Sequence, residues 1–344
     1  RFLAKKNCNI KIFEKNKIGA QTSSKSTKLL HGGLRYLEYG QFSLVKESLA
    51  ERSWWLKNSP QDLVRKLEIY IPIYKKSRNK ILYKSALTLY DFLAGKKNIG
   101  SHRYYQFQEL ITECKDIKSK NLIGGFKFFD AQMYDYELCI WLSKELEKRN
   151  NIKIFEQAEV LSIDEDGFIK LEDNRLHQKN KFDYIINASG PWSEELLKKS
   201  NIKSKYSLSL IRGSHLLVNK PIKNSYLLEV PCSKRIFFVL PYKTKTLVGT
   251  TEKDHMIGEK IECSKDEEDY LIDSYNYYFK EKLCKDYVTF SGIRPIIKSK
   301  KDFTSASREY AIEKNGRIVN VFGGKWTTAN SLARKVADII DVLK

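Results

Sequence analysis

Histidines and basic side chains inside glycine-containing turns are the residues of this sequence best suited to chemistry. Such turns occur at residues 31–36 (HGGLRY), 212–215 (RGSH), 292–295 (GIRP) and 323–328 (GGKWTT). Glycine lets a backbone approach a ligand closely, so we predict that these turns converge on one anionic substrate. Two histidines and several fixed cations suit an enzyme that binds a phosphate and removes a proton. Because imidazole titrates near neutral pH, His31 is the predicted base, with His215 as the alternative base or an orienting residue.

Basic residues outnumber acidic ones, with 62 Lys and Arg against 42 Asp and Glu and a formal net charge of +20. Only 14 of the basic residues are arginines, whose planar guanidinium binds phosphate in a way that lysine does not. Arg35, Arg294 and Lys325 lie in the glycine-containing turns, and we predict that they bind a phosphate and stabilise developing alkoxide charge. Arg235 and Arg308 are further candidates, although either could be a structural ion-pair residue.

The positive charge has three interpretations. Lysines are spread along the whole chain, so a lysine-rich composition is the simplest one, and an anionic membrane surface or a nucleic acid would be the alternatives. We expect no nucleic-acid partner, because no RRM, KH or mixed basic and aromatic signature is present. A hydrophobic content of 42% excludes a disordered chain, and no run of about 18 apolar residues predicts a transmembrane helix.

Cysteine spacing bears on metals and on the cellular compartment. The six cysteines form no C-x-x-C pair, which disfavours both a zinc site and a disulfide framework. We therefore expect no metal site and a reducing, cytoplasmic environment. No signal peptide is visible, and the first residue, Arg1, suggests that the natural N-terminus is missing.

The first elements that would position the site are a strand and a hydroxyl-rich loop. Residues 10–14 alternate as a strand that ends in Glu14, and they follow a stretch, 2–6, that is typical of a helix end. An acid at this place is typical of the second strand of a Rossmann unit, where it binds ribose hydroxyls. The stretch 22–27 either caps a helix or contacts a pyrophosphate, and its candidate residues are Thr22, Ser23, Ser24 and Ser26.

Two buried strands each run into a glycine turn. Residues 182–187 lead into 188–192, and residues 318–322 lead into Gly323 and Gly324, followed by a helix from about Thr327. Ligands commonly bind at such strand ends in open α/β sheets. We also predict helices at 42–57 and 135–149, a strand at 152–155 and a hairpin near 166–167.

A second domain is indicated by a change of pattern. From about 205 to 290 the apolar residues alternate, which predicts an antiparallel sheet. The stretch 78–97 mixes apolar and basic residues, namely Ile81, Leu82, Leu89, Phe92 and Leu93 with Lys80, Lys84, Lys96 and Lys97. We interpret it as a helix that packs on the core and exposes a lysine face, with contact to a membrane surface as the alternative.

Taken together, these stretches resemble the FAD-dependent glycerol-3-phosphate dehydrogenases of the D-amino-acid-oxidase-like flavoprotein superfamily. The resemblance extends from about Phe13 to Lys344. It is carried by residues 22–38 (TSSKSTKLLHGGLRYLE), 187–192 (NASGPW), 212–215 (RGSH), 249–251 (GTT), 292–295 (GIRP), 307–309 (SRE) and 323–328 (GGKWTT). The N-terminal G-x-G-x-x-G with its strand and the C-terminal helical domain are missing. The resemblance is therefore to a short form, from which we expect weaker FAD binding.

The resemblance implies an α/β fold with two domains. A Rossmann-like FAD-binding domain, truncated at its N-terminus, would comprise residues 1–58, 128–200 and 288–344. An inserted α+β substrate domain on an antiparallel sheet would comprise residues 59–127 and 201–287.

The activity that the resemblance implies is oxidation of sn-glycerol 3-phosphate to dihydroxyacetone phosphate, with hydride transfer to FAD and onward electron transfer to a quinone. The implied catalytic residues are His31, Arg294 and His215. Substrate would contact Arg35, Tyr36, Arg235, Arg308, Lys325 and Thr327. FAD would contact Glu14, Thr22, Ser23, Ser24, Ser26, His31, Gly32, Val160, Ala188, Gly190, Trp192, Gly292, Gly324, Lys325, Trp326 and Thr327.

One alternative remains on the same fold. An FAD-dependent oxidase or dehydrogenase of another 2-hydroxy acid or amino acid would use a single bidentate arginine for its carboxylate, rather than several convergent cations. We expect the protein in the cytoplasm or at the inner face of the cell membrane.

Overall fold

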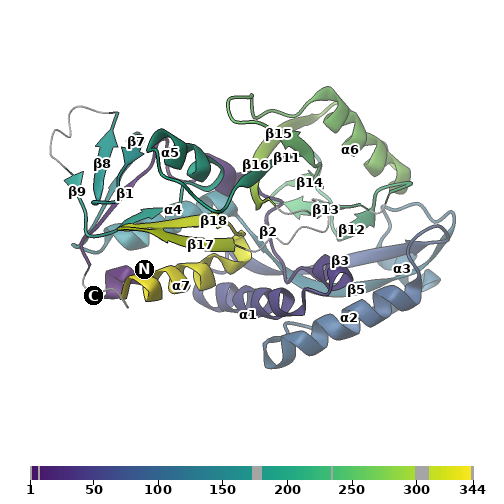
Figure 1. Ribbon diagram of the computed structural model, residues 1–344. Helices are drawn as coiled ribbons and strands as arrows, with labels where there is room; N and C mark the ends of the chain where they lie inside the picture. The colour runs from purple at the N-terminus through teal and green to yellow at the C-terminus, as the bar shows by residue number, and fades with distance from the viewer. Residues whose placement is uncertain (1, 7, 173–179, 234, 299–309, 342–344) are drawn as a thin grey trace.

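The computed structural model describes residues 2–6, 8–172, 180–233, 235–298 and 310–341. Two groups of elements lie side by side, and the two ends of the drawn chain lie close together within one of them (Figure 1). That group holds short parallel strand pairs and their helices. The other is built on a 10-stranded mixed sheet, so the predicted α/β class is confirmed.

Parallel strand pairs organise the first group. β1 (Ile10–Phe13) pairs with β6 (Ile152–Phe155), while β10 (Ile185–Asn187) pairs with β18 (Ile318–Gly323). On its other edge β18 carries the antiparallel β17 (Tyr310–Asn315). These strands confirm those predicted near 10–14, 152–155, 182–187 and 318–322.

The remaining elements of this group are short helices and a small antiparallel sheet. They are η1 (Leu3–Lys6), η2 (Thr22–Ser24), α4 (Asp135–Glu147), β7 (Val160–Ile163), β8 (Phe168–Leu171), β9 (Asn180–Lys181), η6 (Gly190–Trp192), α5 (Ser193–Lys199), η7 (Trp326–Thr328) and α7 (Ala329–Asp341). Local charge explains α5: Glu194 and Glu195 begin it, Lys198 and Lys199 end it, and they pair across one turn.

The large sheet joins segments that are far apart in the sequence. Its order is β15-β11-β14-β13-β12-β3-β5-β2, with β16 beside β11 and β4 beside β5. All pairs are antiparallel except β12 with β3, where Ser225 lies opposite Ile69. The strands are β2 (Leu29–Leu30), β3 (Val64–Tyr74), β4 (Arg103–Gln106), β5 (Leu122–Met133), β11 (Leu208–Val218), β12 (Ser225–Glu229), β13 (Ile236–Tyr242), β14 (Lys245–Gly249), β15 (Lys253–His255) and β16 (Tyr287–Ile297).

Helices cover both faces of this sheet. Along β3, Ile69, Ile71 and Ile73 join a core cluster with α1 (Phe42–Asn58) and α2 (Lys80–Ala94). The alternate side chains Tyr70 and Tyr74 join a second cluster with α3 (Phe107–Glu113) and α6 (Lys265–Tyr278). Because successive side chains of a strand point to opposite faces, β3 is apolar on both sides and shows no alternation. The short helices η3 (Leu34–Tyr39) and η4 (Gly95–Lys97) complete the architecture.

Three expectations from the sequence need correction. The stretches 212–215 and 292–295 are not turns: they lie inside β11 and β16, where they pair with each other. Residues 265–278 form α6, although the whole range 205–290 was expected to alternate as strands. A capping box between Ser264 and Glu267 starts this helix. On α2 the core side is Tyr83, Leu87, Tyr90 and Ala94, whereas Ile81, Leu82 and Phe92 are exposed to 70%, 49% and 78%. These three apolar side chains therefore do not pack on the core.

The described residues contain no helix that is both long and apolar enough to cross a membrane. We propose the division into two domains given above. β5 and β16 run through its boundaries at 127/128 and 287/288, so the two domains share continuous strands.

Candidate active site

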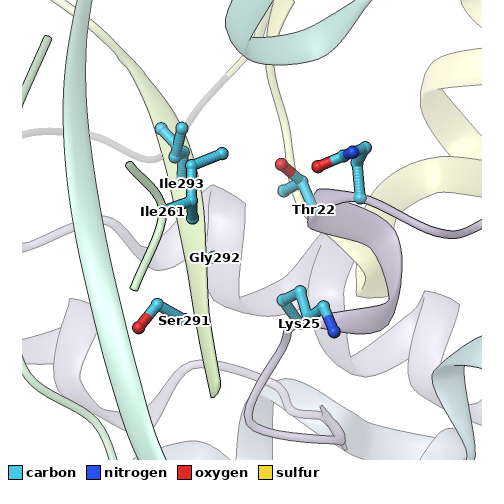
Figure 2. Close-up of a pocket in the computed structure, with 7 residues that line it drawn as sticks. Thr22, Lys25, Ile261, Ser291, Gly292 and Ile293 are labelled. Carbon is cyan, nitrogen blue, oxygen red and sulfur yellow. The ribbon is translucent and has the colours of Figure 1, made fainter. Parts of the chain in front are cut away.

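The carboxyl ends of β10 and β18 meet the 22–25 turn and the middle of β16. The indole Nε1 of Trp326 donates to the carbonyl of Ser23 at 2.8 Å, which ties the turn after β18 to η2. A cleft of about 70 Å³ lies between this turn and β16, and Figure 2 shows Thr22 and Lys25 on one side of it and Ser291, Gly292 and Ile293 on the other. A Cβ built on Gly292 would lie 2.6 Å from Cβ of Lys25, so only glycine fits there.

Backbone turns around this cleft fit a dinucleotide cofactor. Gly190, with φ of +59°, has open space beside it, and Gly323 and Gly324 have φ of +70° and +93°. Such turns leave peptide N–H groups accessible to a pyrophosphate at the ends of parallel strands. Ala188 precedes Gly190 and Trp192 follows it, in the segment that leaves β10.

Glu14 lies where the sequence predicts, directly after β1. Its carboxylate accepts from the N–H of Asn16 at 2.9 Å, and its carbonyl accepts from the N–H of Ala158, just before Val160. Glu14 is half-buried, and a carboxylate directly after the second strand of a Rossmann unit is the group that accepts from ribose hydroxyls.

The hydroxyl-rich loop holds itself in place through a buried ion pair that the sequence did not reveal. Lys28 Nζ lies 2.7 Å from Asp135 Oδ1, and the same carboxylate accepts from the Ser26 hydroxyl at 2.8 Å. Ser24 donates its hydroxyl to the carbonyl of Gln21. The hydroxyls of Ser24 and Ser26 thus brace the loop, while Thr22 lines the cleft.

His31, Tyr36 and Lys325 lie together. The rings of His31 and Tyr36 are 6.3 Å apart, and Lys325 Nζ lies 4.6 Å from the centre of the Tyr36 ring. Gly33, with φ of +81°, makes the turn from His31 into η3. On the other side, Trp55 Nε1 donates to the carbonyl of Thr327 at 3.1 Å, which fixes the segment that carries Lys325.

Arg294 and Arg235 share one carboxylate, Glu252, which the sequence did not identify. Arg294 Nη1 and Arg235 Nη2 lie 3.3 and 3.4 Å from its two oxygens. Arg294 Nη2 also donates to Thr250 Oγ1 at 2.8 Å. The guanidinium of Arg235 lies 5.5 Å from the centre of the Tyr270 ring, so these groups form one cluster between β13, β16 and α6.

Arg35 belongs to the same neighbourhood. Burial raises the pKa of the Tyr270 phenol, while the charges of Arg235 and Arg35 lower it. Arg35 Nε and the Tyr270 hydroxyl are both buried without a hydrogen-bond partner among the described residues. Unsatisfied buried donors cost free energy unless a ligand binds them, so this cluster is suited to an anion.

His215 is 1% exposed, and its ring stacks on Phe290 with centroids 4.8 Å apart. Its Nε2 lies 3.0 Å from Thr27 Oγ1. Burial, then the charges of Arg294 and Lys28, hold its pKa well below the usual range, so the ring is neutral at physiological pH. This geometry favours the orienting role over the role of base.

A second buried ion pair fixes the turn that carries Thr250 and Glu252. Glu267 on α6 accepts from Arg212 Nη2 at 2.6 Å, from the Thr251 hydroxyl at 2.6 Å and from the Ser214 hydroxyl at 2.8 Å. The network connects α6, β11 and the turn after β14, and thereby sets the position of Arg294.

Two further predictions concern Arg308 as a substrate-binding residue and the expected absence of a metal site. Arg308 lies outside the described residues. No cluster of His, Cys, Asp or Glu that could hold a metal ion occurs within the described ranges.

Curated relatives are similar over almost the whole chain. Glycerol-3-phosphate dehydrogenase of Pseudomonas tolaasii is 30% identical over an alignment of 340 positions, which covers 94% of this chain and 64% of that protein. Aerobic glycerol-3-phosphate dehydrogenase of Escherichia coli strain K12 is 29% identical over 94% of this chain and 67% of its own. D-erythritol 1-phosphate dehydrogenase of Brucella abortus is 32% identical over 97% of this chain and 69% of its own. The chain spans about two thirds of the length of these relatives.

Solved structures agree on the fold. Glycerol-3-phosphate dehydrogenase from Bacillus halodurans, complexed with FAD, superposes with a TM-score of 0.76 at 21% identity, over 98% of this chain and 60% of that one. L-alpha-glycerophosphate oxidase from Mycoplasma pneumoniae, with FAD bound, gives 0.74 at 17% identity, over 99% and 91%. A family model described as FAD dependent oxidoreductase matches residues 1–339, and the chain therefore belongs to this family, the DAO family.

Proposed function

We propose that the protein oxidises sn-glycerol 3-phosphate to dihydroxyacetone phosphate with FAD as the hydride acceptor. The observation that carries this proposal is the pair of guanidinium groups, Arg235 and Arg294, on Glu252, with the buried Nε of Arg35 as a further donor. A phosphate dianion suits such a cluster better than a carboxylate does, because it presents more acceptor oxygens and more charge. Relatives named for phosphorylated polyols support the same choice.

We assign each residue of the site a role from its position. Arg35, Arg235 and Arg294 bind the phosphate, and Lys325, beside Tyr36, binds the substrate near its reacting end. His31 accepts the proton of the secondary hydroxyl, and its neighbour Tyr36 limits the orientation of the imidazole. FAD, when bound, supplies the acceptor for the hydride that leaves the same carbon. Glu14, Thr22, Gly190, Gly292 and Gly324 would hold this cofactor.

We further propose that electrons pass to a membrane quinone and that α2 contacts the membrane surface. Its exposed face combines Ile81, Leu82 and Phe92 with Lys80 and Lys84, and the exposed Lys96 and Lys97 follow on η4. An apolar face flanked by lysines suits an anionic lipid surface, into which the apolar side chains insert while the lysines contact headgroups.

A comparison of substrates tests the proposal. The FAD-loaded protein is mixed without oxygen with sn-glycerol 3-phosphate, D-erythritol 1-phosphate, glycerol or glycine, and the visible flavin absorbance is recorded. We expect bleaching by sn-glycerol 3-phosphate at the lowest concentration and none by glycerol, which lacks the phosphate. Faster bleaching by D-erythritol 1-phosphate would make the longer polyol the substrate, and bleaching by glycine alone would exclude a phosphate site.

A further inference from the structure

A buried carboxylate that takes no part in the proposed chemistry holds the turn of His31. Asp130 on β5 is 3% exposed, and its Oδ1 accepts three hydrogen bonds. The donors are Arg52 Nη1 on α1 at 2.8 Å, the Tyr90 hydroxyl on α2 at 2.7 Å and the peptide N–H of Gly32 at 3.1 Å. One oxygen atom thus connects two helices and a strand to the residue that follows His31.

The cluster is densely hydrogen-bonded as well as buried. Arg52 is 1% exposed and also donates to the carbonyl of Phe129 at 2.8 Å, and its guanidinium lies 5.8 Å from the centre of the Tyr90 ring. Removing two charges from water is costly, and only well-formed hydrogen bonds offset that cost. Helix α1, helix α2 and β5 therefore hold the carboxylate at a fixed position.

Backbone geometry transmits this position to His31. The N–H of Gly32 belongs to the planar peptide unit that starts at the carbonyl of His31, so fixing the N–H direction fixes ψ of His31. A Cβ on Gly32 would lie 2.4 Å from the Tyr90 hydroxyl and 2.4 Å from Leu49 Cδ2, which shows how closely the turn packs on both helices.

We propose that Asp130, together with Arg52 and Tyr90, is a positioning residue for His31. This inference rests on the proposed function, in which His31 accepts the substrate proton. The cluster does not touch the substrate but sets the direction of the imidazole. Loss of one of its hydrogen bonds should therefore slow the proton transfer and leave substrate affinity unchanged.

Tyr90→Phe is the test variant, because it removes one hydrogen bond to Asp130 and keeps the ring in the core. The matched control is Tyr83→Phe on the same buried side of α2, where the hydroxyl donates to Glu229 at 2.5 Å. Hydrogen exchange needs no catalysis: we expect faster exchange of the peptide that spans 29–36 in Tyr90→Phe but not in Tyr83→Phe. Equal exchange of this peptide in both variants and the wild type would overturn the proposal.

Flavin reduction by sn-glycerol 3-phosphate gives the second readout, in a cycle with His31→Asn. We expect Tyr90→Phe to lower the limiting rate at least about tenfold with an unchanged dissociation constant. In the His31→Asn background the same change should have no further effect. A full additional loss in that background, or a wild-type rate in Tyr90→Phe, would overturn the positioning role while leaving the proposed function intact. A wild-type rate in His31→Asn would instead remove the proposed base, and with it the inference.

Discussion

Glu252 is the residue that sets how the proposed phosphate site works. Its carboxylate lies between Arg235 and Arg294, at 3.4 and 3.3 Å, and reduces the repulsion between the two guanidinium groups. A phosphate must share these cations with Glu252, so only an anion that makes several strong hydrogen bonds can compete. The arrangement thus selects against weakly charged substrates.

The variant Arg294→Lys should bind the phosphate less well, because lysine keeps the charge but cannot bind Thr250, Glu252 and a phosphate at once. We expect kcat/KM to fall by an amount that corresponds to about 1.5–3 kcal/mol of lost transition-state stabilisation, which is the contribution of a hydrogen bond to a charged group. Steady-state kinetics with sn-glycerol 3-phosphate measure it. Arg317→Lys is the control and should leave kcat/KM unchanged. Arg317 is 45% exposed and precedes β18, whose other end leads into the glycine turn at Gly323 and Gly324. Equal kcat/KM in Arg294→Lys and the wild type would remove Arg294 from the phosphate site.

Glu267 makes stability depend on pH in acid solution. Burial alone would raise its pKa, but hydrogen bonds from Thr251, the Ser264 N–H, Arg212 and Ser214 lower it from 4.5 to about 2. Because the folded pKa is depressed, the ionised carboxylate stabilises the fold above about pH 4.5, and this contribution disappears as the pH falls towards 2.

Glu267→Gln should therefore lower the free energy of unfolding by about 3 kcal/mol at pH 7, since Arg212 loses its buried counter-charge. The difference from the wild type should shrink as the pH falls from about 4.5 towards 2. Urea unfolding at a series of pH values measures both effects, and Glu262→Gln, at an exposed carboxylate, serves as the control. A difference that stays constant down to pH 2 would show that the charge of Glu267 is not what stabilises the fold.

At the scale of elements, the sequence predicts those whose signal is local. The strand before Glu14 alternates, the helix from Asp135 begins with acidic residues, and the strand before Gly323 is a short, mostly apolar run. β3 has no alternation because it is buried on both faces, and α6 contains four tyrosines, a residue type that also favours strands, so neither was predicted.

For the candidate active site, too, the sequence identifies only residues that a local pattern marks. His31 and Lys325 stand in recognisable glycine turns, whereas Arg294 is marked in the sequence by a glycine nearby but lies within β16. Glu252 and Asp130 gain their roles only from contacts with residues far away in the sequence, and no local pattern distinguishes them from other acids.

The exposed face of α2 is the element whose role is easiest to test. Changing Lys80, Lys84, Lys96 and Lys97 to Glu should abolish co-sedimentation with anionic phospholipid vesicles, and added salt should weaken the wild-type binding as the Debye length shortens. The control changes Lys203, Lys205, Lys220 and Lys223, exposed lysines outside α2 and η4, to Glu and so alters the net charge equally. Equal loss in both variants would point to general attraction by net charge, and unchanged binding of the α2 variant would exclude this face.

At the scale of the whole molecule, two groups of elements meet at one site. The parallel strands and their glycine turns supply the places that fit FAD, and the large sheet supplies Arg235, Arg294 and His215. The turns at 31–36 and 323–328 lie where the two groups meet. Continuous strands through the domain boundaries keep these parts in register, which a reaction between a bound cofactor and a bound substrate requires.

Stopped-flow reduction of the FAD-loaded protein by sn-glycerol 3-phosphate, without oxygen, tests the central claim most directly. In the wild type, sn-glycerol 3-phosphate should reduce the flavin and so bleach its visible absorbance. His31→Asn should do so about 10²–10⁴-fold more slowly with a similar substrate dissociation constant, and higher pH should partly restore its rate as hydroxide replaces the missing base. A wild-type protein that binds FAD but is not reduced by sn-glycerol 3-phosphate, or a His31→Asn variant that is reduced at the wild-type rate, would contradict this account.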